Sequence, residues 1–380
     1  MKQLENIRVI DVSRLLPGAY CSLILKDFGA EVIKVEEPRH GDYMRLMPPF
    51  LKGGVSANFA MVNRGKKSVV LDLKSKTGKD SFLKLLKTAD IFIEGFRPGT
   101  MKRLGFGYDK VKKINSKLIY CSLSGYGQTG PYKDLASHDL NYLCLSGILH
   151  PPHGVKERPF IPPTQFADIC GGSLMAAISI LAALLERNKT KKGKHIDISL
   201  LDGTIALMIL SYAQLQAAND EYHKWDSGLR GFFPNYALYK TKDGRFIGFC
   251  PVERKFWGAF CDTIERKDLK DKLPHYIGAH EAIPHNEVEK LAQELDTIFV
   301  SKTFSEWDEF FKRTDVCLTP LRTKEEMLKS SYVKDRKLFI SSPVKGFSYL
   351  RTPFTPLSLK GDDLRVPKLG EHTKIYMQQK

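Results

Sequence analysis

The sequence lacks the cysteine patterns that form covalent or metal-bound frameworks. Its seven cysteines are scattered and odd in number, and none of them belongs to a C-x-x-C pair. A disulfide scaffold and a zinc ribbon both need paired, closely spaced cysteines, so the sequence argues against both classes. Unpaired thiols are typical of a reducing compartment, and we expect a cytoplasmic protein.

The sequence also lacks long apolar runs and targeting signals. Its longest apolar run, around Leu174–Leu185, is shorter than the roughly 20 residues that a membrane-spanning helix needs. Met1–Ser13 has no basic region followed by an apolar stretch, and Ile375–Lys380 carries no Ser-Lys-Leu address. We therefore expect no membrane association and no secretory or peroxisomal signal.

Several motifs of nucleotide binding and catalysis are missing or incomplete. There is no Walker P-loop, and the nearest match to a G-x-S-x-G nucleophile elbow, Gly54–Asn58, lacks the second glycine. Gly125–Gly130 matches G-x-G-x-x-G, but Pro131 follows it where a dinucleotide site needs a helix, and Leu143–Leu149 offers no acid for the ribose. We interpret this segment as a turn-forming loop.

Length and positive charge are what the sequence does have. Its 380 residues suggest about two domains, and 59 Lys+Arg against 43 Asp+Glu give a net charge of +16. This excess admits a nucleic acid, a membrane surface or a polyanionic small molecule as partner. Basic pairs lie dispersed among acids, without zinc-finger, RNP or helix-turn-helix spacing, so we expect no nucleic-acid partner.

The first half alternates short apolar runs with periodic stretches of helical length. The apolar runs predict strands at Arg8–Val12, Glu31–Val35, Val69–Leu73, Asp90–Glu94 and Leu118–Leu123. The periodic stretches predict helices at Ala19–Phe28, Lys76–Lys87 and Gly172–Leu185, the last apolar all round and therefore buried between layers. Such alternation predicts an α/β fold with a Rossmann-like, mostly parallel sheet.

The pattern changes after about Asp226. The second half is predicted to contain a hairpin around Asp243-Gly244 and two amphipathic helices: Tyr236–Thr241 with Arg245–Cys250, then Asn286–Phe299 and Phe304–Arg313. The predicted organisation is a large α/β domain over 1–200, a linker helix over 201–225, a smaller α+β domain over 226–330 and a C-terminal return to the large domain over 331–380.

Two segments carry chemically capable side chains. Ser137–Tyr142 (SHDLNY) precedes an apolar stretch, and Asp168 is a lone carboxylate just before an apolar helix. A helix start offers free N–H groups and favours negative charge. Each residue also has a structural interpretation, Asp168 as the N-cap of that helix and His138 as a hydrogen-bonded core histidine. The residues alone leave both alternatives open.

The sequence resembles the family III CoA-transferases over nearly the whole chain, and within that family it is most similar to the α-methylacyl-CoA racemases. Six sequence blocks, which follow one another in the same order as in the family, carry this resemblance. The blocks are Asn6–Ser13, Asp27–Glu36, Asn63–Ser68, Leu71–Lys74, Glu94–Gly99 and Gly370–Thr373. The resemblance implies a large α/β domain built from both chain ends, a smaller domain, and two chains interlocked as a homodimer with active sites between the large domain of one and the small domain of the other. It also implies an acyl-CoA thioester substrate, no metal and no further cofactor.

The resemblance assigns the candidate catalytic residues. Asp168 matches the carboxylate that transferases use as a nucleophile and racemases as an acid/base. His138, followed by Asp139, matches the histidine that racemases pair with it, and Glu253 a glutamate that assists this histidine. Inverting the weakly acidic α-carbon of a thioester needs a base on one face and an acid on the other, and a His/Asp pair can exchange these roles. Free N–H groups after Asp168 would hold the enolate oxygen, and Asp139 and Glu253 would orient or tune the pair.

The resemblance also assigns the CoA-binding residues. The nucleotide is expected along Leu71, Asp72, Leu73, Lys74, Gly95, Phe96, Arg97 and Arg103, and the pantetheine arm along Ser137, Asn141 and Tyr142. Arginine and lysine suit the phosphates of CoA. Two features of the sequence depart from the racemases. This chain has Glu37 before Pro38, where racemases carry an arginine, and its own arginine, Arg39, follows Pro38. The segment Tyr43–Ala60 is longer than the corresponding segment of racemases and is similar to that of transferases.

Three hypotheses follow. The leading one is epimerisation of 2-methylacyl-CoA thioesters through an enolate. The alternative is a family III CoA-transferase, in which Asp168 forms an anhydride and then an enzyme–CoA thioester. The third is a basic nucleic-acid-binding protein without catalysis. Because chemistry resides in the site rather than in the scaffold, the set His138, Asp168 and Glu253 favours the epimerase.

Overall fold

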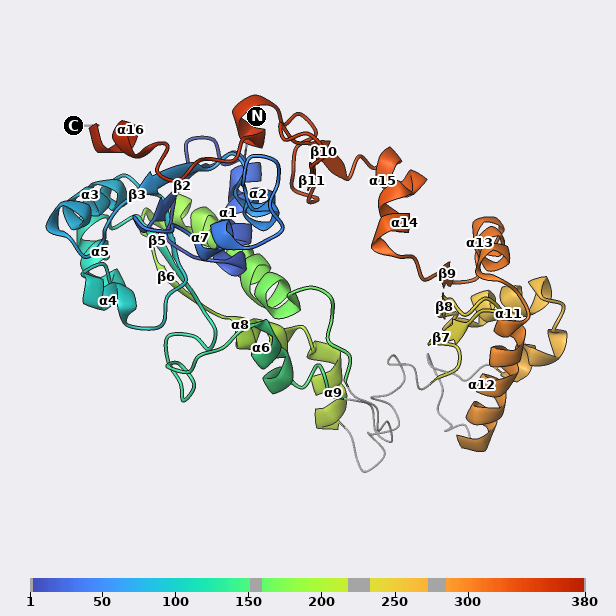
Figure 1. The fold of residues 1–380 in the computed structure, drawn as a ribbon. Helices are drawn as coiled ribbons and strands as arrows, with labels where there is room; N and C mark the ends of the chain where they lie inside the picture. The colour runs from blue at the N-terminus through green and yellow to red at the C-terminus, as the bar shows by residue number, and fades with distance from the viewer. Residues whose placement is uncertain (1–2, 151–158, 218–232, 273–284, 379–380) are drawn as a thin grey trace. The chain divides into compact units, whose positions relative to one another are not determined.

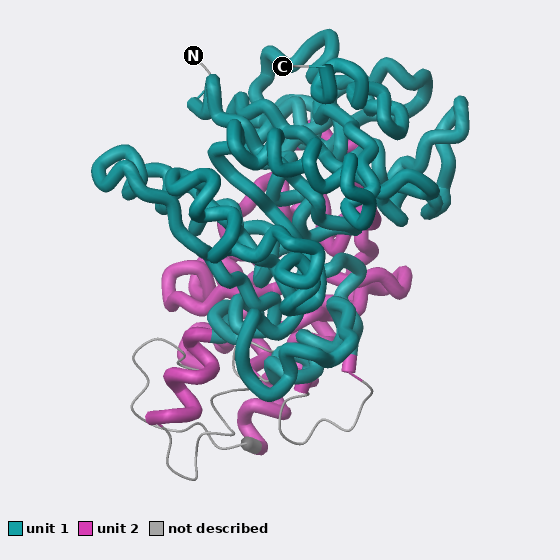
Figure 2. The backbone as a smooth tube through the Cα atoms, turned by 90° about the vertical axis from the view of Figure 1, so that its left-hand side faces the viewer, with its two compact units in different colours: residues 1–149, 160–208, 333–380 teal, residues 150–159, 209–332 magenta. Residues whose placement is uncertain are grey.

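A computed structural model of the chain describes residues 3–150, 159–217, 233–272 and 285–378. The chain forms two compact units, which Figure 2 colours separately. Unit 1 comprises Met1–Leu149, Phe160–Met208 and Val333–Lys380, and unit 2 comprises His150–Pro159 and Ile209–Tyr332. Each unit has its own hydrophobic core and is described by itself.

The centre of unit 1 is a parallel sheet of six strands (Figure 1). In sheet order the strands are β3 (Lys67–Val70), β2 (Glu31–Glu36), β1 (Arg8–Asp11), β4 (Ile91–Glu94), β5 (Ile119–Ser124) and β6 (His195–Ser199). The strands run parallel in every pair, as short apolar runs separated by helices predict. The predicted α/β fold is confirmed.

Helices cover both faces of this sheet. Successive strand residues point to opposite faces, so Ile91 and Ile93 of β4 enter one core and Phe92 the other. The first core is closed by α1 (Leu16–Asp27) and α7 (Met175–Thr190), and the second by α3 (Lys76–Lys87), α4 (Thr100–Leu104) and α5 (Tyr108–Ile114).

Shorter elements complete unit 1. They are η1 (Tyr43–Leu46), α2 (Ala57–Asn63), α6 (Asp139–Ser146), a π-helix (Ala167–Leu174), α8 (Leu200–Ala206), β10 (Phe339–Ser341), β11 (Ser348–Leu350), η5 (Gly361–Leu364) and α16 (Thr373–Gln378). The segment before α16 lies along the edge strand β3: His372 N–H donates to Ser68 O (2.9 Å), and Val70 N–H donates to Thr373 Oγ1 (3.0 Å). These bonds satisfy backbone groups that an open sheet edge would expose.

Strand β3 ends earlier than the apolar run Val69–Leu73 predicts. The chain turns after Val70, with Asp72 Oδ1 accepting from Lys74 N–H (2.9 Å) and Asp72 O accepting from Ser75 N–H (3.1 Å). An aspartate that bonds the backbone two residues on favours a turn over a strand. The segment 71–74 is therefore a loop at the carboxyl end of β3.

The helix predicted over Gly172–Leu185 is longer and less buried than expected. It starts as the π-helix at Ala167 and continues as α7 to Thr190, and Ile178 and Leu185 are 63% and 68% exposed. Only the face toward β5, β6 and α1 is packed, so burial on all sides was wrong. By length and composition this run of 24 residues could cross a membrane, but an apolar core helix of a soluble protein passes the same test. The pair α8 and α9 (Ile209–Ala217), bent by 64°, also passes.

Unit 2 is a small α+β unit. Its antiparallel sheet, in order, consists of β7 (Ala237–Lys240), β8 (Phe246–Phe249) and β9 (Leu318–Pro320). The hairpin predicted around Asp243-Gly244 is confirmed. The helices are α9, α11 (Arg254–Thr263), η4 (Lys267–Lys272), α12 (His285–Val300), α13 (Phe304–Arg313) and α14 (Lys324–Lys329), and α15 (Ser331–Asp335) crosses the unit boundary. The predicted linker helix over 201–225 corresponds to α8 and α9, and residues 218–232 lie outside the described part.

Candidate functional site

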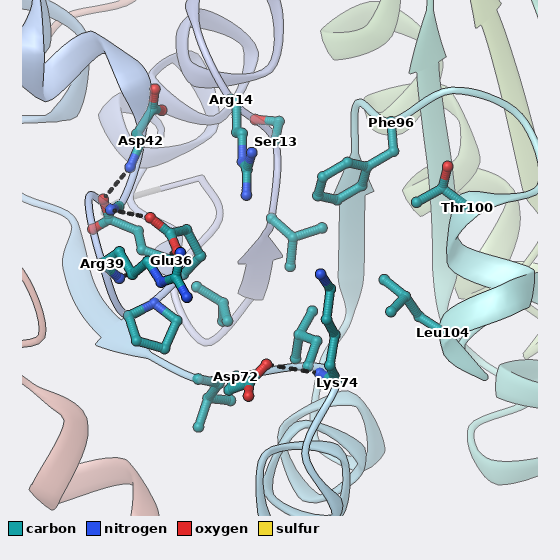
Figure 3. A pocket seen from close by; sticks show the side chains of 17 residues that line it. Ser13, Arg14, Glu36, Arg39, Asp42, Asp72, Lys74, Phe96, Thr100 and Leu104 are labelled. Carbon is teal, nitrogen blue, oxygen red and sulfur yellow. Dashed lines mark hydrogen bonds between the residues drawn. The ribbon is translucent and has the colours of Figure 1, made fainter.

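A cavity of about 600 Å³ lies at the carboxyl ends of β1 to β4 in unit 1 (Figure 3). The strand order reverses between the adjacent strands β1 and β4. The chain leaves the carboxyl ends of these two strands in opposite directions, and such a reversal opens a crevice between the two loops. The lining comes from four loops and from α4: Val12–Arg14, Val35–Asp42 except His40, Leu71–Lys74, Phe96, and Thr100 with Leu104.

Buried carboxylates in the cavity wall are paired. Glu36 accepts from Arg45 Nε (2.7 Å) and Nη2 (2.8 Å) and from Ser68 Oγ (2.7 Å). Asp42 pairs with Lys34 (2.7 Å), and both side chains are 1% exposed. Burial alone would raise the pKa of Glu36, but the bond and charge of Arg45, together with Lys34 and Ser68, outweigh it, so this pKa lies below its usual value. Both acids are therefore paired with protein cations.

Cations that face the cavity are not neutralised in the same way. Arg14, Arg39 and Lys74 line the cavity, and none of them forms an ion pair with a carboxylate of the described residues. The carboxylates of Glu37 and Asp72 line the same cavity, also without an ion pair among the described residues, so the three cations leave only a small excess of positive charge. This excess suits phosphate or another anion. Arg14 was not identified from the sequence, although its place directly after a predicted strand is the signal that could have found it.

The expected CoA-binding residues divide among different places. Leu71, Asp72, Leu73, Lys74 and Phe96 line the cavity, whereas Gly95, Arg97 and Arg103 are not among its lining residues. Arg103 Nη2 donates to Thr100 Oγ1 (3.0 Å) on the cavity helix α4. Arg97 lines a second cavity of about 430 Å³, to which Met101 and Lys102 of α4 contribute together with Glu94 and His195.

A hydrogen bond joins the two segments that carry the candidate catalytic residues. His138 is the N-cap of α6 and is exposed, and its N–H donates to Asn141 Oδ1 (2.9 Å). Asp139 Oδ1 accepts from Asp168 N–H (2.9 Å), which fixes the start of the π-helix against α6. The alternative of a core histidine is therefore wrong for His138, and Asp139 directly contacts the backbone of Asp168.

The environment of Asp168 favours its protonated form. Burial, and then the charge of Asp139, raise the pKa of Asp168 from 3.8 to about 7. The helix starts after Phe166, so Asp168 lies within the first turn and the N-cap interpretation is wrong. The N–H groups of Asp168 and Ile169 already donate to Asp139 Oδ1 and to Gln165 O, so the expectation of free N–H groups fails for these two.

The other residues of the SHDLNY segment pack on the glycine loop. Ser137 Oγ and Tyr142 Oη lie 2.7 Å apart. A Cβ at Gly125 would come within 2.4 Å of Tyr142 Oη, so any other residue there would displace the side chains of Tyr142 and Ser137. The loop Gly125–Gly130 bends and opens no helix, which confirms the turn interpretation. Burial raises the pKa of Tyr142, and the charge of Asp168 raises it further, whereas the bond to Ser137 lowers it.

A short loop connects the cavity with the Asp168 helix. Ser13 and Arg14 line the cavity, and three residues later Pro17 O accepts from Ser173 Oγ (2.7 Å) of the π-helix. Close packing of α8 holds the same π-helix from another side: a Cβ at Gly203 would lie 1.9 Å from Gly171 O. The cavity and the candidate acid/base group are therefore built on one connected set of elements.

Glu253 lies in the other unit. It is exposed and is the N-cap residue of α11 in unit 2, whereas His138 and Asp168 belong to unit 1. Its assistance to His138 stays a prediction. Among the described residues, no group of three or more His, Cys, Asp or Glu side chains is arranged to hold a metal ion.

Comparisons with known proteins agree on one family. A sequence model of CoA-transferase family III matches residues 4–373. The chain is 34% identical to the α-methylacyl-CoA racemase of Homo sapiens, over 99% of this chain and 93% of that protein. It is 33% identical to the acetyl-CoA:oxalate CoA-transferase of Acetobacter aceti, over 97% and 93%. The crystal structure of Rv3272 from M. tuberculosis in its orthorhombic form superposes with a TM-score of 0.83 at 27% identity, covering 99% of each chain.

These similarities confirm the resemblance that the six sequence blocks carry. The nearly equal identities to a racemase and to a transferase do not separate the two reactions. Because the family model and both relatives span almost the whole sequence, the chain belongs to CoA-transferase family III and is an enzyme of its racemase or transferase type.

Proposed function

We propose that the chain epimerises the α-carbon of 2-methylacyl-CoA thioesters by 1,1-proton transfer through an enolate. The observation that carries this proposal is the carboxyl of Asp168, whose pKa is raised to about 7 and whose N–H is bonded to the residue after His138. A carboxyl of this pKa can both donate and accept a proton near neutral pH. A nucleophilic carboxylate must be ionised, so the same environment is less suited to anhydride formation.

Two side chains perform the proposed proton transfers. His138 removes the α-proton of one epimer, and Asp168 returns a proton to the opposite face of the enolate. For the other epimer the roles reverse, because each group ends a turnover in the state that the reverse reaction requires. Asp139 tunes Asp168 through charge and through its hydrogen bond to Asp168 N–H, and Glu253 assists His138. Both transfers use side chains, so the proposal needs no metal and no redox group.

The cavity of unit 1 accommodates the nucleotide of CoA in this proposal. Its free cations suit the phosphates, and Leu71–Lys74 and Phe96 supply backbone and apolar contacts. The loop from Ser13 to Pro17 leads from the cavity to the π-helix, which supports a thioester arm that passes Ser137 and Tyr142 on its way to Asp168.

Proton exchange in deuterated water tests the epimerase directly. A single-epimer 2-methylacyl-CoA, without an acceptor acid, should lose its α-proton to solvent and equilibrate with the other epimer. His138→Ala should abolish epimerisation, and exchange from the epimer whose α-proton faces His138, because that face of the enolate then lacks its acid/base group. Asp134→Asn, which changes an exposed carboxylate paired with Lys133, is the control and should exchange normally. A pure, folded wild-type enzyme without exchange contradicts the proposal.

The alternative is CoA transfer between carboxylic acids through an aspartyl anhydride and an enzyme–CoA thioester on Asp168. The named transferases among the relatives and the long segment Tyr43–Ala60 favour it. It predicts ping-pong kinetics and a covalent adduct on Asp168 that hydroxylamine traps. His138→Ala would leave transfer partly intact, whereas it abolishes epimerisation.

The proposal includes a cytoplasmic homodimer. The apolar face of α7, with Ile178 and Leu185 exposed, is a surface of the kind that association covers. One chain has a mass of 43.1 kDa, and light scattering on the purified protein should give twice this mass. A monomer that retains full activity contradicts the dimer and leaves the epimerase test unaffected.

A further inference from the structure

Two cysteines lie opposite each other at one end of the small sheet of unit 2. The last paired residues of β8 and β9 (Figure 1) are Phe249 and Leu318, and Cys250 and Cys317 are the next residues outward on the two strands. Cys250 N–H donates to Cys317 O (2.9 Å), so the two cysteines extend the ladder by one further pair. They are 67 residues apart in the sequence, which is why the spacing of the cysteines gave no sign of a pair.

The positions of the two backbones suit a disulfide. Residues that share a hydrogen bond directly across an antiparallel pair have Cα atoms about 5.5 Å apart. The Cα atoms of disulfide-linked cysteines are roughly 4.4–6.8 Å apart, so the bond needs no large movement of the backbone. The Cys250 thiol points toward its partner, because its Sγ donates to Cys317 O (3.5 Å). Burial, and then the charge of Cys250, raise the pKa of Cys317, an influence that a distant thiol would not have.

Solvent reaches this pair of cysteines. Cys250 is exposed and Cys317 is partly exposed, whereas Cys21 and Cys121, both in the first core of unit 1, are each 0% exposed. Cys317 has φ 52°, in the left-handed region that residues other than glycine rarely adopt. Backbone strain that the surroundings enforce is characteristic of functional positions. An exposed disulfide is easier to reduce than a buried one, so this pair is suited to a reversible bond and not to a structural one.

We propose that Cys250 and Cys317 form a reversible disulfide by exchange with a small disulfide such as oxidised glutathione, and that the carboxylate of Glu253 slows this exchange. The inference is independent of the proposed function, because the two thiols react whether or not the chain binds CoA. In a reducing compartment the pair stays reduced, and the disulfide forms when small disulfides accumulate. It joins the turn that leads from β8 to Glu253 with the turn that enters β9.

The exchange takes two steps. The Cys250 thiolate attacks one sulfur of the small disulfide, the S–S bond of that disulfide breaks, and one small thiolate leaves. The Cys317 thiolate then attacks Cys250 Sγ in the mixed disulfide, and the second small thiolate leaves. The two cysteines together lose two electrons, which reduce the small disulfide, and the two protons that the cysteines lose end on the two small thiols.

Charges around the pair set the rate of these steps. Burial, and then the charge of Glu253, raise the pKa of Cys250. Burial, the charge of Cys250, and then the charges of Glu253 and Asp315 raise the pKa of Cys317, whereas Lys255 lowers it. Only the thiolate attacks, so exchange is slow at neutral pH and becomes faster as the pH rises. Glu253→Gln removes a negative neighbour of both thiols, lowers both pKa values and should therefore speed exchange at a given pH.

Peptide mass mapping of the full chain tests the proposal. The folded protein is incubated with oxidised glutathione, its remaining thiols are alkylated, and it is digested without a reductant. The expected product is a linked pair of peptides that contain Cys250 and Cys317 and that separate in dithiothreitol. Cys144→Ser, which removes another exposed thiol, is the control and should give the same link. Cys317→Ser should instead retain glutathione on Cys250, because the second step then lacks its thiolate.

The opposite results are equally clear. In a folded sample, Cys21 and Cys121 stay unmodified because they are buried. If Cys250 and Cys317 are separately alkylated in such a sample while Cys144 carries glutathione, the proposal is overturned, because the oxidant reached an exposed thiol and the pair did not close. A link that forms only in denaturant overturns it as well. A Glu253→Gln protein that forms the link no faster than the wild type overturns the part assigned to the Glu253 carboxylate.

Discussion

Replacing Asp139 with asparagine should move the pH profile of proton exchange toward lower pH. Burial, and then the charge of Asp139, raise the pKa of Asp168 from 3.8 to about 7. Asparagine removes that charge but keeps an oxygen that can accept the hydrogen bond from Asp168 N–H, 2.9 Å in the wild type. The change therefore isolates the electrostatic contribution from the structural one.

The two causes bound the size of the effect. The pKa of Asp168 rises by about 3, and burial is the larger cause, so Asp139 accounts for less than half of the rise. In Asp139→Asn, we expect the part of the pH profile that depends on the titration of Asp168 to shift to lower pH by up to about 1.5 units. This shift corresponds to about 2 kcal/mol of interaction between Asp139 and the ionised form of Asp168. The sign follows from removing a negative neighbour, which favours ionised Asp168 and lowers its pKa.

The two epimers report opposite limbs of the same titration. Where Asp168 donates the proton, activity is lost as the pH rises through its pKa, so Asp139→Asn loses activity at a lower pH than the wild type. Where Asp168 accepts the proton, activity is lost as the pH falls through its pKa, so the variant stays active at a lower pH. Exchange from each single epimer in deuterated water, measured from acidic to alkaline pH, gives both limbs.

Two further variants complete this experiment. Asp134→Asn removes an exposed charge from the same loop and should leave both limbs in place. Asp139→Ala removes the hydrogen-bond acceptor as well, so it should lower activity at every pH in addition to moving the limbs. If both limbs of Asp139→Asn stay at the wild-type position or move up, Asp139 does not set the pKa of Asp168 and the reasoning is refuted.

Two predictions concern stability, measured by denaturant unfolding. Arg64→Ala should lower the free energy of unfolding by about 3–5 kcal/mol, because it leaves the fully buried Asp27 carboxylate without its bidentate partner. Arg365→Ala is the control, because it removes an exposed ion pair, and it should lower the free energy of unfolding by less than about 1 kcal/mol. Equal losses in the two variants would contradict the argument. Gly203→Ala should reduce both stability and exchange activity, because its Cβ would lie 1.9 Å from a backbone oxygen of the π-helix. Gly258→Ala in α11 is the control: its Cβ meets open space, so it should raise the free energy of unfolding by up to about 1 kcal/mol. If the Gly203→Ala enzyme is as stable and as active as this control, the close packing at Gly203 is disproved.

Elements set by local signals were predicted well from the sequence. The helices α3 and α13 have the predicted bounds to the residue. Ser75 caps α3 through Gly78 N–H, and Thr303 forms a capping box with Glu306 at the start of α13. These signals involve residues three apart, so they act whatever the rest of the chain does.

Two element boundaries were not predicted. The run Val69–Leu73 predicted a strand through Leu73, yet β3 ends at Val70, and the local bond from Lys74 N–H to Asp72 Oδ1 favours a turn there. The π-helix at Asp168 depends on packing against α1 and α8, and on the bond from Asp139 on another helix. The pattern of apolar residues contains none of these interactions, so it could predict a helix there but neither its start nor its type.

For this chain, the sequence alone determined the family, the alternation of strands and helices, and the residues capable of the chemistry, because these follow from residue types and their order. Only the tertiary structure decided which charges are available. Glu37 and Arg14 both line the cavity, but the Glu37 carboxylate accepts from N–H groups of its own turn, whereas Arg14 forms no ion pair with the described residues. Asp168 is an ordinary acid in sequence and titrates near 7 in the fold. The physical reason is that burial and neighbouring charge set the energy of an ionised group, and folding brings those neighbours from distant parts of the chain.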